Sequence, residues 1–208
     1  MPTQLFTIGL LMLFTAILPG PDFALVTKNT LRYSRRSGFF TTMGLGCAAL
    51  MHISYCAFGL AVIISNSLLL FSAIKYIGAG YLIYLGITCL LSKQSNQNAL
   101  PNKPIKNRTV SDLTSFRQGF FCNLLNPKAS LFFLALFTLV IKPATPTSWL
   151  IVYVIEIFFI IILWFSSLVF ILSHPRVAQL LEKAEKYIIK ILGSFLIGFG
   201  VLLLFAKK

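Results

Sequence analysis

The sequence predicts an all-α, polytopic membrane protein with six transmembrane helices. Its 208 residues are 57% hydrophobic and only 11% charged, whereas soluble domains carry about 25% charged residues. Six stretches are apolar and long enough to cross a bilayer, which takes about 20 residues in a helix. The Lys and Arg residues are concentrated in three of the connections between these stretches. Water is therefore not the main solvent of this chain.

Six apolar stretches follow one another along the chain, roughly at 4–27, 39–64, 68–91, 118–141, 148–172 and 188–206. The first is interrupted by Pro19-Gly20-Pro21-Asp22, and the fourth by Asn126-Pro127-Lys128 near its start. A proline inside a helix removes a hydrogen bond and clashes with the preceding turn, at a cost of about 3 kcal/mol or more. We therefore predict that helices one and four are broken, with a simple packing kink as the alternative.

The connection 92–117 divides the chain into two halves, 1–91 and 118–208, within one transmembrane domain. It is rich in Ser, Asn, Gln, Pro and Lys, which predicts a flexible cytoplasmic linker. With three helices in each half, the second half enters the membrane from the opposite side, as in transporters built from inverted repeats. The two broken helices fall in corresponding positions, so we predict a 3+3 inverted-topology repeat.

Basic residues predict the orientation of the helices. The chain holds 18 Lys and Arg against 5 Asp and Glu, a net charge of +13. Most of them lie in 28–37, 92–117 and 173–190, which fall on one side of a six-helix protein. By the positive-inside rule this side is cytoplasmic and both termini face outward. Between apolar runs these charges favour contact with anionic lipid over nucleic acid. The segment 175–190 has the pattern of an amphipathic helix at the membrane surface.

The two helix breaks carry the residues with the clearest chemistry. A charged carboxylate inside a span costs about 2.5–3.5 kcal/mol, which makes Asp22 a candidate functional residue as well as a candidate N-cap for a half-helix that begins at Phe23. Asn126 and Pro127 suit the cap and the first position of a second half-helix, whose N-terminus attracts anions. We hypothesise that Asp22 binds an α-ammonium group, while the Asn126 end and Lys128 bind an α-carboxylate.

Other polar residues inside the spans allow more than one interpretation. Lys75 either extends to the membrane surface or has a functional role. Glu156 is either a counter-ion for Lys75 or a proton carrier. His52 is expected to be a packed polar residue. The glycines of helices two and three predict close contacts between helices; they are Gly44, Gly46, Gly78, Gly80 and Gly86. The four cysteines, Cys47, Cys56, Cys89 and Cys122, form no CxxC pair and are expected to be small apolar residues.

Four motifs agree in order and spacing with those of one protein family. They are Pro19-Gly20-Pro21-Asp22, a glycine-rich second span around Gly44, the run KYIGAGYLIYLG at 75–86, and FRQGF leading to NLLNPKA at 116–129. Across nearly its whole length the chain resembles the LysE/RhtB family of bacterial amino acid exporters. This resemblance implies a six-helix inner-membrane protein that exports an amino acid or a derivative, with the proton-motive force as the driving force.

Three other classes stay open at this stage. A membrane redox protein would relay electrons through cysteines, but none of the cysteines are paired. A cation exporter would need a metal site, for which two His and few intramembrane acids are a poor set. A structural protein of the membrane would tolerate substitution of Asp22 and Asn126. The expected partners are an amino acid, the lipid bilayer and protons, without nucleic acid, cofactor or metal, and a homo-oligomer stays open.

Overall fold

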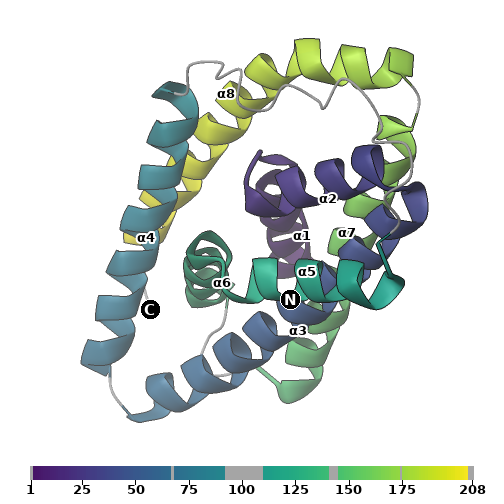
Figure 1. Cartoon of the computed structure of the whole chain (residues 1–208). Coiled ribbons are helices and arrows are strands. Elements are labelled where there is room, and N and C mark those ends of the chain that lie inside the picture. Colours follow the sequence, from purple (N-terminus) through teal and green to yellow (C-terminus); the bar gives the residue numbers. More distant parts are fainter. Residues whose placement is uncertain (1, 67, 92–109, 141–144, 174, 206–208) are drawn as a thin grey trace.

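The computed structural model describes residues 2–66, 68–91, 110–140, 145–173 and 175–205, and this part of the chain is all-α (Figure 1). Residues 92–109 of the predicted linker lie outside it. No strand occurs in the described residues, which confirms the predicted fold class. The helices are, in order, α1 (Pro2–Ile17), α2 (Pro21–Arg32), α3 (Arg35–Asn66), α4 (Leu68–Leu91), α5 (Asp112–Leu124), α6 (Pro127–Val140), α7 (Thr147–Leu172) and α8 (Pro175–Phe205).

Four of these helices contain a stretch that is long and apolar enough to cross a membrane by itself, in α3, α4, α7 and α8. The other four form two bent pairs. The α1–α2 pair and the α5–α6 pair are each bent by 58° at a short break. Counted as one broken span each, these pairs bring the total to six, with the breaks in spans one and four as predicted. Each half of the chain therefore consists of a bent pair followed by two long helices.

Two boundaries differ from the prediction. Helix α5 begins at Asp112, inside the stretch that was assigned to the linker, because Ser111 caps it by accepting a hydrogen bond from the Thr114 amide at 3.2 Å. Helix α8 runs without interruption from Pro175 to Phe205. The expected surface helix and the sixth span are therefore one helix, since no Gly or Pro stands between Arg176 and Leu192 to end it. The side chains of 175–186 lie outside the described residues.

Close helix contacts at glycines join the two halves of the chain. Helix α3 packs on α5, and a Cβ at Gly44 or Gly119 would overlap a backbone carbonyl of the other helix. Helix α4 packs on α8, where a Cβ at Gly193 would lie 2.9 Å from the Gly86 carbonyl oxygen. Gly46 and Gly78 are also in close contact with neighbouring helices, as predicted, whereas Gly80 faces open space and that expectation was wrong. Small residues allow helix backbones to approach this closely in membranes.

Polar contacts reinforce the interface between α3 and α5 at one end. Arg36 of α3 donates to both carboxylate oxygens of Asp112 on α5, with a closest distance of 2.6 Å. Ser37 directly follows Arg36, and Ser115 lies about one turn after Asp112; their hydroxyl groups are 2.8 Å apart and buried. Asn29 of α2 joins this region by donating to Gln118 of α5 at 2.9 Å. Three helices are thus held together at this end of the bundle.

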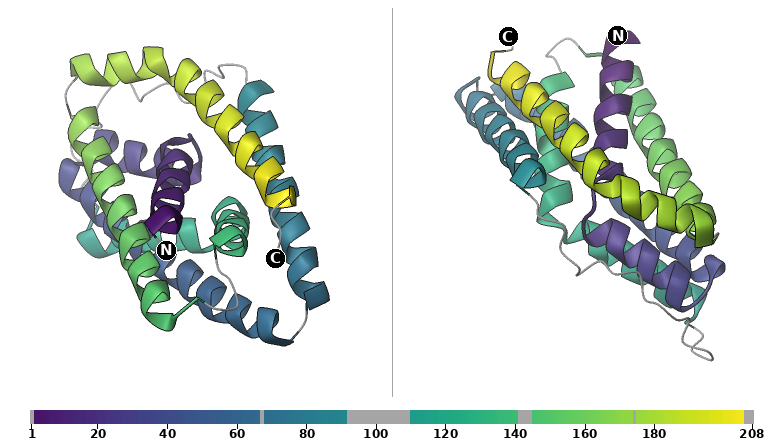
Figure 2. Two further views of the ribbon diagram at one scale, coloured as in Figure 1. Left: turned by 180° about the vertical axis from the view of Figure 1, so that it is seen from behind. Right: turned by 90° about the horizontal axis from the view of Figure 1, so that it is seen from above.

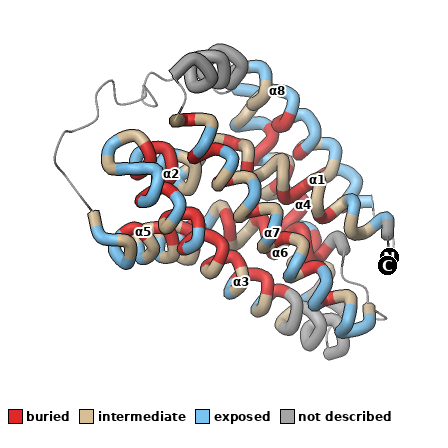
Figure 3. The backbone as a smooth tube through the Cα atoms, turned by 90° about the vertical axis from the view of Figure 1, so that its right-hand side faces the viewer, coloured by how far each residue is buried: buried red, intermediate tan, exposed pale blue. Residues whose placement is uncertain are grey.

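The outer faces of the bundle are apolar. Figure 3 shows exposed positions on the outward sides of the helices and buried positions on the inward sides. Large apolar side chains are highly exposed, for example Leu69 at 83% and Leu163 at 63%. A continuous apolar exterior of this kind is suited to lipid. Inside the ring of longer helices lie α1 and α6 (Figure 1), and both contribute to the central core, which includes Ile8, Leu11, Phe132 and Phe133.

The start of α1 and the end of α8 lie at the same end of the molecule (Figure 2). This arrangement requires an even number of membrane crossings and agrees with six. It does not identify which end faces the cytoplasm, so the predicted outward position of both termini stays a prediction.

Candidate functional site

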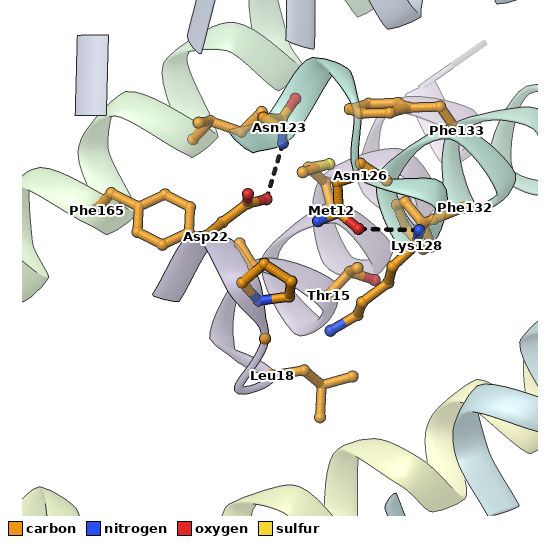
Figure 4. A pocket seen from close by; sticks show the side chains of 15 residues that line it. Met12, Thr15, Leu18, Asp22, Asn123, Asn126, Lys128, Phe132, Phe133 and Phe165 are labelled. Atoms are coloured by element: carbon orange, nitrogen blue, oxygen red, sulfur yellow. Dashed lines mark hydrogen bonds between the residues drawn. The ribbon is translucent and has the colours of Figure 1, made fainter. Parts of the chain in front are cut away.

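The two helix breaks face each other across one cavity of about 40 Å³ (Figure 4). Its polar lining comes from Thr15, Asp22, Asn123, Asn126 and Lys128. Its apolar lining includes Met12, Leu18, Phe132, Phe133, Ile161 and Phe165. One water needs about 10–15 Å³ of such space, so the cavity has room for a few water molecules. An amino acid is larger than that, and its entry would require the walls to move apart.

The first break places a carboxylate at the start of a half-helix. Gly20 is the N-cap of α2 in an extended conformation, and Pro21 occupies the first helical position. Asp22 was expected to cap a helix beginning at Phe23, and this expectation was wrong. Because the fixed φ of proline suits the first helical position, the helix begins at Pro21 and Asp22 lies inside its first turn. Its negative charge is favourable there, next to the positive end of the helix dipole.

Asp22 bonds to the other bent pair instead of capping its own helix. Its Oδ2 accepts a hydrogen bond from Nδ2 of Asn123 on α5 at 2.8 Å (Figure 4). The thiol of Cys122 lies 3.5 Å from Oδ1. The carboxylate therefore links the start of α2 to the end of α5.

The second break follows the predicted capping pattern. Oδ1 of Asn126 accepts a hydrogen bond from the Lys128 amide at 3.0 Å, and α6 begins at Pro127. The side chain of Lys128 extends to the first break, where Nζ lies 3.5 Å from the Pro19 carbonyl oxygen. This carbonyl follows the C-terminal end of α1, where the helix dipole favours a positive charge.

Asp22 and Lys128 occupy equivalent places in the two halves of the chain. Each directly follows the proline that begins a half-helix, and each side chain extends to the opposite break. One is an acid and the other a base. The cavity between them therefore offers an anion and a cation within largely apolar walls, an arrangement suited to a small solute that carries both charges.

His52 on α3 lies next to this site, beside Asn123, and is 1% exposed. Its Nε2 is 3.0 Å from the carbonyl oxygen of Asn123. A carbonyl oxygen can only accept, so Nε2 carries the hydrogen, and in a neutral ring Nδ1 accepts from the hydroxyl of Tyr55. The imidazole also stacks on Phe133, with ring centroids 5.3 Å apart. The prediction of a packed polar residue is confirmed, and the packed ring supports Asn123.

The structure brings only part of the predicted site together. Gly20, Pro21, Asp22, Asn126 and Lys128 line the cavity, while Pro19 contributes its carbonyl and Pro127 begins α6. Glu156 and Lys75 are outside the lining. Glu156 on α7 lies against Gly9 of α1. Lys75 on α4 is buried, with its ammonium group 5.3 Å from the centroid of the Tyr76 ring.

The sequence patterns do not indicate that Asn123, Thr15, Phe132 and Phe133 line this cavity. A usable signal existed for Asn123, which precedes Asn126 by three residues and so lies about one helical turn before the break. The aromatic residues gave none, because an apolar side chain in an apolar helix has the same pattern whether it lines a cavity or packs. Among the described residues, no three His, Cys, Asp or Glu side chains are grouped so that they could hold a metal ion.

Two broken helices, one from each half of the chain, meet at a polar cavity inside the bundle. Broken helices in corresponding positions that meet at a site within the membrane are typical of membrane transport proteins. The family model described as LysE type translocator matches residues 13–207. The chain belongs to this family, and it is therefore a transporter and not an enzyme.

Two of the relatives named here span most of the chain, and a third spans about two thirds of it. It is 35% identical to the uncharacterized membrane protein YrhP of Bacillus subtilis, over 89% of this chain and 90% of that protein. It is 26% identical to the threonine efflux protein of Salmonella typhi, over 97% of this chain and 98% of that protein. It is 29% identical to the leucine efflux protein of Salmonella choleraesuis, over 64% of this chain and 61% of that protein. No solved structure matches the chain.

Proposed function

We propose that this protein exports an amino acid or an amino acid derivative across the bacterial inner membrane, driven by the proton-motive force. Membership of the translocator family and relatives named for threonine and leucine efflux support amino acid efflux. The observation that carries the proposal is the pair of opposite charges, Asp22 and Lys128, on the two half-helices that flank one cavity. Every α-amino acid has an ammonium and a carboxylate group to match them.

The ammonium end of the substrate would bind at Asp22. The carboxylate accepts from Asn123, and Oδ1 of the same amide is buried without a hydrogen-bond donor. A buried acceptor that lacks a donor is costly and calls for an explanation. A substrate ammonium group has three N–H donors, enough for the Asp22 carboxylate and the Asn123 amide oxygen together.

The carboxylate end would bind at the start of α6. Lys128 provides a positive charge, and the N-terminus of the half-helix favours an anion. In the structure Lys128 bonds to the Pro19 carbonyl with a long distance of 3.5 Å, so a substrate carboxylate would offer it a stronger partner. The side chain of the substrate would face the apolar walls formed by Met12, Phe132 and Phe165.

Amino acid efflux from cells tests this proposal. Cells that express the protein are loaded with dipeptides containing threonine or leucine, and the amino acids that appear outside are quantified. Expression is expected to speed the release of one or a few amino acids. Asp22→Asn, which removes the negative charge and keeps the size, is expected to abolish that gain.

Asp112→Asn is the matched control, because it removes the same charge from a partly exposed ion pair outside the cavity. It is expected to retain efflux at equal abundance in the membrane. Normal efflux by Asp22→Asn would refute the assignment of Asp22 to the substrate ammonium group. Unchanged release of every amino acid on expression of the unaltered protein would refute amino acid export and leave only a derivative as the substrate.

A further inference from the structure

A second carboxyl group lies between α1 and α7, apart from the cavity. Glu156 on α7 packs against α1 at Gly9, where its Oε1 is 2.9 Å from the position that a Cβ would occupy. Its other oxygen, Oε2, is buried and accepts no hydrogen bond. The glycine is thus what allows a carboxyl group to fit between the two helices.

Among the described residues, no cation balances the charge of Glu156. Helix α1 carries no titratable side chain, and the group that faces Glu156 from its own helix is Tyr153, whose hydroxyl donates to Gln4 of α1 at 3.0 Å. No described Lys, Arg or His forms an ion pair with Glu156. The other titratable residues of the elements packed on α7 are Asp22, Lys28 and Arg32 on α2, Arg35, Arg36, Cys47, His52, Tyr55 and Cys56 on α3, and Tyr187 and Lys190 on the described part of α8.

A carboxylate in this position is costly, because a buried charge needs both a counter-charge and hydrogen-bond donors. The sequence suggested Lys75 as the partner of Glu156. Lys75 is on α4, however, and α4 is not among the helices that pack substantially on α7. Taking up a proton from water removes the charge and most of the cost. The geometry therefore favours the protonated acid while α1 and α7 are in contact.

The same two helices form part of the cavity wall. On α1, Met12 and Thr15 line the cavity one and two turns beyond Gly9, and on α7, Ile161 and Phe165 line it beyond Glu156. A movement that separates α1 from α7 to admit a substrate would also expose Glu156 to water. Binding of the substrate and binding of a proton would then favour different arrangements of one helix pair, which couples the two events.

We infer that Glu156 is the group that binds and releases the proton exchanged for the substrate. It takes up the proton from water on one side of the membrane and returns it to water on the other, and no covalent bond other than O–H forms or breaks. This inference rests on the proposed function and adds the identity of the coupling site.

The test separates movement of the amino acid from its coupling to protons. The full-length protein is reconstituted into liposomes, with labelled threonine and labelled leucine as probes. Counterflow without a pH gradient measures passage of the amino acid alone. Accumulation driven by an imposed pH gradient measures coupling, and a trapped pH-sensitive dye reports proton movement directly.

Glu156→Gln is expected to keep counterflow and to lose gradient-driven accumulation and substrate-dependent proton movement, down to the level of empty liposomes. Glu156→Asp, which keeps the ionisable group, is expected to restore part of both coupled readouts. Gradient-driven accumulation by Glu156→Gln equal to that of the unaltered protein would overturn the inference. Loss of counterflow as well would also overturn it, since the residue would then serve folding or passage itself. Absence of counterflow in the unaltered protein would refute transport of threonine and leucine, a result distinct from both.

Discussion

At the scale of single residues, Asn123 joins two parts of the site that no sequence motif connects. Its side chain donates to Asp22, and its backbone carbonyl accepts from His52. The carbonyl belongs to the last turn of α5, where helix carbonyls have no partner within the helix. The Asn126 amide already donates to this carbonyl at 3.0 Å, so the imidazole is its second donor, and it fixes the backbone from which the Asn123 side chain reaches the cavity.

Replacement of His52 by Ala is expected to leave this buried carbonyl without the imidazole donor. The carbonyl keeps the Asn126 amide as a donor, and the loss of one hydrogen bond costs about 0.5–1.5 kcal/mol, so thermal unfolding of the purified protein in detergent should shift to lower temperature. Ser54→Ala on the same helix is the control, because the Ser54 hydroxyl bonds only to a carbonyl of its own helix. Equal unfolding temperatures for His52→Ala and the unaltered protein would contradict the role given to His52.

The residues of the site were predictable where their chemistry is unusual for a membrane helix. Asp22 and the Asn126-Pro127-Lys128 break stand out because charge and proline are costly in a span. The roles of Asn123 and His52 could not be predicted in this way, since a single amide or imidazole gives no indication of its tertiary partner. The equivalence of Asp22 and Lys128 became clear only when the structure placed both directly after a helix-initiating proline.

At the scale of elements, the two breaks are built differently although they have the same bend. The first begins with glycine as N-cap and without a side-chain cap bond, whereas the second has the Asn126 side chain as cap. The second break is therefore the one whose stability depends on a single side chain.

Asn126→Ala is expected to destabilise the start of α6, because loss of an N-cap side chain costs about 0.5–2 kcal/mol. Asn126→Ser retains a capping oxygen and is expected to lose much less. Thermal unfolding in detergent compares the two variants with the unaltered protein. Identical behaviour of the Ala and Ser variants would show that the cap makes no contribution.

Helix breaks were easier to predict than helix ends. Two prolines with a glycine, or a proline after an asparagine, mark a break from local chemistry alone. The start of α5 was missed by six residues because Ser111-Asp112 is a capping signal within a stretch whose polar composition favoured a linker. The sequence of α8 changes from amphipathic to apolar, and this change was interpreted as the boundary between two helices. It marks only a change in the surroundings of one continuous helix.

At the scale of the whole molecule, charge and architecture together make a prediction about orientation. The start of α1 and the end of α8 share one end of the bundle (Figure 2), and basic residues are concentrated in the connections of the opposite side. The positive-inside rule then assigns that opposite side to the cytoplasm.

A reporter that is active only outside the cytoplasm is expected to be active when fused after Lys208, and inactive when inserted within 92–109. A cytoplasm-specific reporter at the same two positions should give the reverse result. Cytoplasmic activity of the Lys208 fusion would contradict the orientation and, with it, the direction assigned to transport.

The close backbone contacts between α3 and α5 have a consequence for how the protein can move. At Gly44 and Gly119 the two backbones touch with no side chain between them, so a slide of one helix along the other would push a side chain into a backbone. We therefore expect the pair to move as one rigid body that ties the first half of the chain to the second. A movement that admits the substrate is then expected at the breaks that surround the cavity, and not along the contact between these two helices.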